Sequence, residues 1–245
     1  MKNKIALVTG ASKGIGKAIV ERLVNENYFV LAIDIDKENG ERLQNEMGND
    51  KIRFISVDIC DENKTTELFK TISSEYGQLD VLVNNAGIIK DNMIWKMPVE
   101  DFDAVINVNL KGTWLMCREA AKMMKNQNSG RIVNIASRAW LGNRGQSNYS
   151  ASKAGVIGLT RVLALELGKY NVCVNAVAPG LIDTPLSQKL EKDVLQKLID
   201  AQPTRTMGKP EDVANAVAFL ASEKTQFITG QTIYVDGGKS IGAGN

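Results

Sequence analysis

Short apolar runs rich in β-branched residues alternate along this chain with longer stretches that carry helical apolar spacing. The runs that predict strands are residues 5–8, 29–33, 52–57, 81–83, 131–135, 172–177 and 232–235. The stretches that predict helices are residues 16–25, 63–76, 102–124, 150–168 and 210–221. Because strands that alternate with helices build βαβ units, the sequence predicts an α/β fold, a Rossmann-type doubly wound parallel sheet with helices on both faces.

The domain organisation follows from length and punctuation. The chain has 245 residues, a length at which α/β folds commonly form one domain, and it shows no internal repeat or linker. We therefore expect a single domain over residues 1–245. The polar segment 184–209 follows the carboxyl end of a strand and adds no strand of its own. Its residues 187–199 show weak helical apolar spacing. A mobile lid over a substrate would lie in such a place, and an ordinary surface helix pair is the alternative.

Charge and residue content exclude several classes of function. The 30 basic and 28 acidic residues nearly balance, which gives no electrostatic reason to expect a nucleic-acid or anionic-membrane partner. No apolar run reaches the ~20 residues that cross a bilayer, and the start lacks a signal peptide, so we expect a cytoplasmic protein. The chain has no histidine, which excludes Ser-His-Asp and Cys-His catalysis and removes the commonest zinc ligand; no metal site is expected.

A glycine-rich turn follows the first predicted strand and opens the first predicted helix. Gly10, Gly14 and Gly16 have GxxxGxG spacing. A dinucleotide pyrophosphate needs close backbone approach and the unpaired N–H groups of a helix start, and glycines permit both. A turn of this kind can serve shape alone, but its position between the first strand and the first helix favours nucleotide binding.

Asp34 ends the second predicted strand and bears on the choice of nucleotide. An acid at this position can accept hydrogen bonds from the adenosine ribose hydroxyls, and its charge repels a 2′-phosphate. Lys13, in the glycine turn, would instead attract that phosphate. The sequence therefore favours NAD, with NADP as the alternative.

Tyr149 and Lys153 are four residues apart at the beginning of a predicted helix, so they share one helical face. A free phenol titrates near ~10, which is too high for an efficient base at neutral pH. A neighbouring ammonium lowers the pKa of a phenol, as would the positive ring of an oxidised nicotinamide. The pair predicts Tyr149 as an acid/base activated by Lys153; an exposed pair without chemistry is the alternative.

Taken together and in order, the motifs resemble those of the short-chain dehydrogenase/reductase family. The resemblance runs from Thr9 to Gly238 and rests on TGASKGIG at 9–16, Asp58 after a strand, NNAG at 84–87, NVNLKG with Asn109, NIASR with Ser137, YSASK at 149–153 and PG at 179–180. It implies an NAD(P)-dependent oxidoreductase that transfers a hydride between a nicotinamide ring and a carbonyl or secondary alcohol carbon.

The resemblance also assigns a role to individual residues. Catalysis would rest on Asn109, Ser137, Tyr149 and Lys153: the serine would bind the substrate oxygen, the tyrosine would exchange the proton, and the asparagine would hold a water beside the lysine. The positions implied in cofactor binding are Gly10, Ser12, Lys13, Gly14, Ile15, Gly16, Asp34, Ile35, Asp58, Ile59, Asn85, Ala86, Gly87, Tyr149, Lys153, Pro179, Gly180, Ile182 and Thr184. Arg138 and Trp140 depart from the family, which usually has small apolar residues in that loop.

Within the family, the chain is most similar to the bacterial 3-oxoacyl-acyl-carrier-protein reductases of fatty acid biosynthesis, through residues 84–97, 145–155 and 213–238. This similarity implies a 3-oxoacyl thioester as substrate, acyl carrier protein as a partner, and a homotetramer formed through residues 102–124 and 150–168. Two features differ. Asp34 suggests NAD where that group uses NADPH, and only Arg131 is present as a cation for the acidic carrier protein, because Tyr170 stands where a second arginine is common.

Two alternatives remain open. The first is an NAD-dependent dehydrogenase of a small or cyclic secondary alcohol or of a 3-hydroxyacyl-CoA, whose pocket Trp95, Trp140 and Leu141 would line. The second is a non-catalytic nucleotide-sensing protein, which would be expected to lack Ser137, Tyr149 or Lys153, whereas all three are present.

Overall fold

The computed structural model describes residues 4–241. Within that range seven strands form one parallel sheet in the order β3-β2-β1-β4-β5-β6-β7. The strands are β1 (Lys4–Thr9), β2 (Tyr28–Asp34), β3 (Ile52–Ser56), β4 (Val81–Asn84), β5 (Gly130–Ile135), β6 (Val172–Pro179) and β7 (Thr232–Val235). Strand order reverses between β1 and β4, and such a switch point opens a crevice at the carboxyl ends of the strands, where doubly wound sheets bind ligands.

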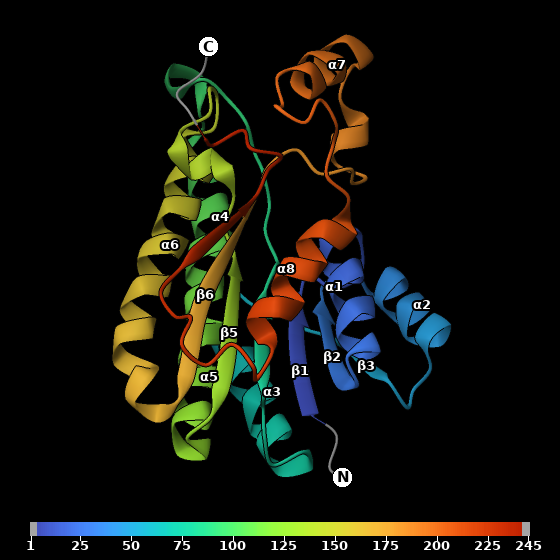
Figure 1. Cartoon of the computed structure of the whole chain (residues 1–245), viewed down its shortest axis with the longest axis vertical. Helices are drawn as coiled ribbons and strands as arrows, with labels where there is room; N and C mark the ends of the chain where they lie inside the picture. The colour runs from blue at the N-terminus through green and yellow to red at the C-terminus, as the bar shows by residue number, and fades with distance from the viewer. Residues whose placement is uncertain (1–3, 242–245) are drawn as a thin grey trace.

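Helices cover both faces of this sheet (Figure 1). One face carries α1 (Gly14–Asn25), α2 (Lys37–Met47) and α8 (Pro210–Ala221). The opposite face carries α3 (Glu62–Glu75), α5 (Thr113–Gln127) and α6 (Ser147–Leu167), and α4 (Val99–Ile106) packs against α6. The expected doubly wound Rossmann-type fold is confirmed. Of the helices within residues 4–241, none is both long enough and apolar enough to cross a bilayer.

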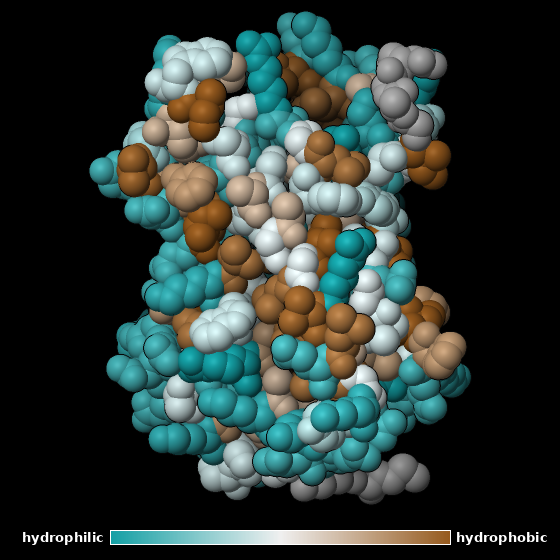
Figure 2. Space-filling model, turned by 90° about the vertical axis from the view of Figure 1, so that its left-hand side faces the viewer, coloured by the Kyte–Doolittle hydropathy of each residue, from teal (hydrophilic) through white to brown (hydrophobic). Residues whose placement is uncertain are grey.

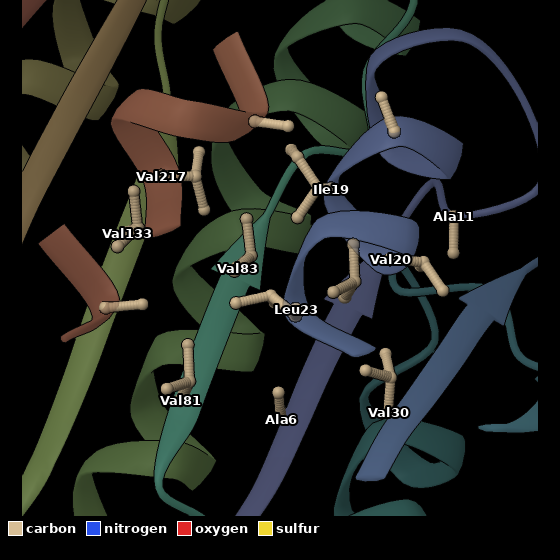
Figure 3. Close-up of a cluster of buried hydrophobic side chains, with 14 of the residues drawn as sticks. Ala6, Ala11, Ile19, Val20, Leu23, Val30, Val81, Val83, Val133 and Val217 are labelled. Atoms are coloured by element: carbon tan, nitrogen blue, oxygen red, sulfur yellow. The ribbon is translucent and has the colours of Figure 1, made fainter. Parts of the chain in front are cut away.

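Fully buried aliphatic side chains join each helical layer to the sheet. On the α1 and α8 face, Ile19, Leu23 and Val217 point toward Val81 and Val83 of the central strand β4 (Figure 3). A second cluster on the opposite face packs α3, α5 and α6 on the same strands. The inner strands β1, β2, β4, β5 and β6 are buried on both faces and are therefore nearly continuous apolar runs, which is why the sequence predicted them well. The edge strands β3 and β7 are only partly buried.

One helix was missed from the sequence. The helix α2, with sequence KENGERLQNEM, buries only Gly40 and Leu43, so its apolar spacing is too sparse to predict a helix. Gly40 interrupts the pattern because Phe54 of β3 packs directly on its backbone: a Cβ there would lie 2.1 Å from the Phe54 ring. Asp36 begins the helix, and its carboxylate accepts from the backbone N–H of Asn39.

The prediction of a single helix over residues 102–124 is wrong in one respect. The segment is divided into α4, a π-helical stretch η2 (Asn107–Gly112) and α5. Apolar periodicity continues through it, so the pattern could not show the extra residue per turn that defines a π-helix. In the segment with helical hints at 187–199, the structure forms η5 (Ser187–Lys189) and α7 (Lys192–Asp200), which stands beyond the carboxyl edge of the sheet at the top of Figure 1.

Candidate active site

The glycine turn connects β1 to α1 at the carboxyl edge of the sheet. Gly10 and Gly14 have φ values of 63° and 55°, which L side chains rarely adopt. A Cβ on Gly16 would lie 1.9 Å from the carbonyl oxygen of Gly10, so Gly16 lets the turn pack against itself. A Cβ on Gly14 would make only ordinary contacts, 3.7 Å from Cγ2 of Thr184. The turn therefore lies directly beside the start of the segment 184–209.

The first turn of α1 is open to an anion. Lys13 occupies the N-cap position and makes no side-chain capping hydrogen bond, and the turn has no acidic residue. The N–H groups of Gly14, Ile15 and Gly16 at this helix start have no intrahelical partners, and together with the helix dipole they favour negative charge. These groups fit the pyrophosphate of the predicted dinucleotide.

Asp34 at the end of β2 is held by the glycine turn. Its Oδ2 accepts from the backbone N–H of Ser12 at 3.0 Å and from the Ser12 hydroxyl, and its Oδ1 accepts from the N–H of Ile35 at 2.8 Å. Lys13 points elsewhere, because its Nζ lies 3.3 Å from Oδ2 of Asp36. The acid is thus fixed beside the turn, whereas the cation that could attract a 2′-phosphate is already paired with a carboxylate.

The residues predicted to flank adenosine lie after β3 and β4. Asp58 is exposed, with Oδ1 accepting from the N–H of Cys60, and Ile59 is buried. Asn85 supports the turn itself, since its Nδ2 donates to the carbonyls of Thr9 and Gly10 at 3.1 and 2.9 Å. The Thr9 hydroxyl accepts from the N–H groups of Asn85 and Ala86, so it ties β1 to β4; sequence reasoning gave Thr9 no role.

The remaining predicted cofactor residues follow β6. Pro179 ends the strand, and the N–H of Gly180 donates to the carbonyl of Val235 at 2.9 Å. A Cβ on Gly180 would lie 2.7 Å from Cβ of Asp236, so only glycine permits this close approach. Ile182 is buried, and Thr184 receives support from the Ser187 hydroxyl, which accepts from its N–H at 2.9 Å. This chain segment leads into α7.

The predicted catalytic side chains converge from β5 and α6. Ser137 lies just beyond β5, and its hydroxyl hydrogen-bonds the phenol of Tyr149, which lies in the first turn of α6. Lys153 is one helical turn further along, buried, with its Nζ 5.6 Å from the centroid of the Tyr149 ring. That Nζ donates to the carbonyl of Ile135 at 2.8 Å. One cluster therefore holds a hydroxyl, a phenol and an amine.

Burial controls the protonation of this cluster. It raises the pKa of Tyr149, an effect that the Ser137 hydrogen bond opposes and the charge of Asp91 reinforces. Burial also lowers the pKa of Lys153 to about 8. Lys153 is not among the groups that shift this pKa, so its predicted lowering of the Tyr149 pKa stays a prediction. The phenol is held in its protonated form, ready to act as an acid.

Asn109 lies in the π-helical stretch and has no exposed surface. Its Oδ1 accepts from the N–H of Ile88 at 2.8 Å, and its Nδ2 donates to the Ile88 carbonyl at 3.0 Å and to the Ser152 hydroxyl at 3.1 Å. The side chain thus braces α6 against the segment after β4. Gly87 completes the arrangement, since a Cβ there would lie 3.2 Å from Oδ1 of Asn109 and 3.6 Å from Nζ of Lys153.

Three supporting residues were not predicted. The Ser152 hydroxyl donates to the carbonyl of Tyr149 at 2.7 Å. Asn148 is fully buried, accepts from the N–H of Tyr149 at 2.7 Å and donates to the carbonyl of Lys90 at 2.9 Å. Gln146 donates to Asp91 at 2.9 Å. The only sequence signal was their proximity to Tyr149, which does not distinguish a buried brace from an exposed side chain.

Comparison with known proteins places this geometry in a family. Residues 10–240 match the family model described as enoyl-(acyl carrier protein) reductase. The chain is 42% identical over 246 residues to the (2S)-((R)-hydroxy(phenyl)methyl)succinyl-CoA dehydrogenase subunit BbsD of Thauera aromatica, covering 100% of this chain and 99% of the relative. It is 43% identical over 244 residues to the 3-oxoacyl-acyl-carrier-protein reductase FabG of Thermotoga maritima, covering 98% and 99%.

Solved structures agree with the sequence relatives. The structure of ElxO with NADP bound has a TM-score of 0.92 and 35% identity, over 97% of this chain and 98% of that one. The structure of levodione reductase has a TM-score of 0.93 and 31% identity, over 98% of each chain. Among residues 4–241 no group of three or more Cys, Asp or Glu side chains is arranged to hold a metal ion. The chain belongs to the short-chain dehydrogenase/reductase family and is an oxidoreductase of the kind that binds a nicotinamide cofactor.

Proposed function

We propose that this protein interconverts 3-oxoacyl and 3-hydroxyacyl thioesters, with NAD as its preferred cofactor. The observation that carries the proposal is the cluster of Ser137, Tyr149 and Lys153 at the carboxyl edge of the sheet. Relatives along the whole chain bear names that specify an acyl-CoA or a 3-oxoacyl substrate. The chemistry common to these substrates is a carbonyl or alcohol carbon in an acyl thioester.

Each residue of the cluster has a separate role in the proposed reaction. Ser137 donates to the substrate oxygen and stabilises the charge that develops on it, while the protonated phenol of Tyr149 gives its proton to that oxygen. A bound nicotinamide cofactor supplies the hydride in this direction and accepts it in the reverse. Lys153, with a pKa of about 8, carries a proton that is exchangeable near neutral pH. Asn109 holds α6 and the segment after β4 in register around these groups.

The cofactor preference rests on the environment of Asp34. The carboxylate is fixed by Ser12 and Ile35, so a 2′-phosphate at the same place would meet an immobile negative charge. We expect the Asp34→Ala variant to lose at least tenfold of the NADH-over-NADPH preference in kcat/KM. Glu38→Ala, an exposed acid at the start of α2, is the matched control. A wild-type protein that prefers NADPH would contradict the cofactor assignment.

A specific observation favours coenzyme A over acyl carrier protein as the thioester carrier. Arg131, the one docking cation that the sequence offered, is buried, and its guanidinium donates to the carbonyls of Gly130, Asn171 and Ser222 at 2.7, 3.3 and 3.4 Å. A charge committed to three internal carbonyls is a poor site for an acidic protein. Tyr170 remains flanked by Lys125 and Lys169, whose Nζ atoms lie 5.4 and 5.2 Å from its ring.

The deciding experiment measures steady-state rates with acetoacetyl-CoA, acetoacetyl-acyl-carrier-protein and neutral cyclic ketones, each with NADH and with NADPH. The proposal predicts the highest kcat/KM for acetoacetyl-CoA with NADH. Equal or higher kcat/KM with the carrier-protein thioester would reverse the choice of carrier. Turnover of cyclic ketones without turnover of any thioester would replace the proposal by the small-alcohol dehydrogenase alternative.

The proposal includes two features of the molecule outside the catalytic cluster. The segment 184–209 is taken as the lid that covers the substrate, supported by its start beside Gly14 and by α7, in which no residue is fully buried. A homotetramer is taken as the working assembly, supported by exposed apolar side chains on α5 and α6.

A further inference from the structure

Arg138 is a half-buried cation that has no partner among residues 4–241. Among the described residues, the arginines that are not fully exposed are Arg22, Arg118, Arg131 and Arg138. Arg22 and Arg118 form ion pairs with glutamates, and Arg131 donates to carbonyls. Arg138 is half-buried, and within residues 4–241 it makes no ion pair and no hydrogen bond. Its Nε is shielded from solvent and unsatisfied.

This situation is costly for a guanidinium. Only Nε is shielded from solvent, so the guanidinium is partly desolvated there without a hydrogen bond to compensate, and arginine cannot lose its proton to avoid that penalty. The other unsatisfied buried side-chain atoms in the described residues are neutral oxygens, those of Asn84, Ser147, Ser150, Gln202 and Ser240. The guanidinium of Arg138 is the only charged group among these unsatisfied atoms, and an anion that binds it could satisfy Nε.

The place of Arg138 connects it to the substrate. It follows Ser137 directly and begins the short helix η3 (Arg138–Leu141). The Ser137 hydroxyl accepts from the N–H of Ala139 at 3.1 Å, and Trp140 Nε1 donates to the hydroxyl of Tyr234 at 2.7 Å. These bonds fix the backbone of η3. Because an arginine side chain extends about 6–7 Å from its Cα by standard bond lengths, its guanidinium stays within reach of a ligand bound at Ser137.

Two other anions are excluded as the partner. Pyrophosphate belongs to the glycine turn after β1, which is separated from β5 by β4, so it lies two strand spacings or about 10 Å away. Asp91, the acid whose charge acts on Tyr149, accepts from Gln146 and forms no ion pair with Arg138. The remaining anion that can approach is part of the substrate itself.

We propose that the substrate carries a free carboxylate a few bonds from its reacting carbonyl, and that Arg138 binds this carboxylate and thereby selects the substrate. The inference rests on the proposed function and makes it more specific: the thioester is that of a dicarboxylic acid. Guanidinium and carboxylate match in geometry and can form two parallel hydrogen bonds, which would satisfy Nε and fix the carbonyl against Ser137 and Tyr149.

The test uses two probes that differ in one group. 3-Oxoadipyl-CoA and 3-oxohexanoyl-CoA have the same chain length, but the first ends in a carboxylate and the second in a methyl group. The wild-type protein with NADH should turn over the first with a kcat/KM on the order of 100-fold higher, the effect of a desolvated charge pair. Arg138→Met should abolish this ratio and Arg138→Lys should retain part of it. Arg144→Met, which removes an exposed arginine of the same loop, should keep the ratio.

A binding measurement separates the two proposals. The Tyr149→Phe variant saturated with NADH should turn over either probe about 1,000-fold more slowly than the wild type. The Kd values of both probes can therefore be titrated by cofactor fluorescence before turnover, whether or not the native protein reduces thioesters. A Kd for 3-oxoadipyl-CoA at least tenfold below that of 3-oxohexanoyl-CoA, and dependent on Arg138, supports the inference. Equal Kd values overturn it. Failure to reduce any thioester, with the difference in Kd intact, overturns the proposed reaction alone.

A structural role for Arg138 predicts a different pattern. If Arg138 only shaped η3, Arg138→Met would lower kcat/KM for both probes alike and would lower the Tm. Under the inference, the variant removes an uncompensated charge, so the Tm of the protein alone should stay the same or rise while the ratio of the two probes collapses. A fall in Tm with an unchanged ratio overturns the proposal.

Discussion

Burial of single side chains sets the protonation states on which the chemistry of this protein depends. The Tyr149 phenol is kept protonated because burial and Asp91 raise its pKa by more than the Ser137 hydrogen bond lowers it. We expect Tyr149→Phe to lower kcat by about 1,000-fold, since it removes the general acid but not the ring. The Kd for NADH should change by less than about twofold. Tyr170→Phe, which alters a tyrosine outside the cluster, is the control, and unchanged turnover in Tyr149→Phe would remove the catalytic assignment.

Lys153 gives a prediction about stability and pH. Burial lowers its pKa from 10.5 to about 8. Between these values the unfolded chain binds more protons than the folded one, so the contribution of Lys153 to the free energy of unfolding rises with pH across that window. Below about pH 8 the buried ammonium is present and its full cost remains.

The measurement is the difference in free energy of unfolding between the wild type and Lys153→Met, obtained by urea denaturation at several pH values. This difference should rise by about 2 kcal/mol from pH 7.5 to pH 10. The raised pKa values of Tyr28, Cys60 and Cys117 act in the opposite direction. They act equally in both proteins, so they cancel. A flat difference would show that Lys153 titrates normally.

At the scale of elements, the sequence predicted the strands and helices whose burial gives a clear apolar pattern. Every strand was predicted, because the inner strands are nearly continuous apolar runs and the edge strands β3 and β7 are rich in β-branched and aromatic residues, with turn residues at their ends. The helix α2 was missed because only Gly40 and Leu43 are buried on it, and the π-helical stretch around Asn109 was missed because apolar spacing does not record helix geometry. Motif residues were placed together as expected, but the braces Asn148 and Ser152 could not be recognised, since their role depends on contacts between distant segments.

The segment 184–209 is the element whose motion the proposed function requires. The amphipathic helix α7 has no fully buried residue, and the segment is joined to the body by Gly208, whose N–H and carbonyl pair with Leu181 and Asp183. Few buried contacts mean a low free energy of local opening. We expect saturating NADH with acetoacetyl-CoA bound to Tyr149→Phe to slow tryptic cleavage after Lys192 and Arg205 at least fivefold. Cleavage after Lys125, on α5, should not change, and equal cleavage at all three sites would show that the segment is not a lid.

At the scale of the molecule, the face formed by α4, α5 and α6 shows apolar side chains in its middle (Figure 2). Leu165 and Val162 of α6 are 86% and 50% exposed, and Trp114 of α5 is 44% exposed. Apolar groups gathered on one exposed face are typical of a surface that a partner covers. The homotetramer expected from the sequence would bury them.

Leu165→Glu tests this assembly, because it places a charge where the proposed interface is apolar. The mass in solution, measured by light scattering, should fall from that of four chains to that of two or one, while Val194→Glu on α7 should leave the mass unchanged. Assembly should also matter for rate, since α6 carries Tyr149 and Lys153 in its first turns and Leu165 near its end. A helix covered on its outer face holds the catalytic pair more rigidly than one with that face in water. The dissociated variant should therefore lose activity together with mass, and a fully active single chain would show that the catalytic site needs no partner.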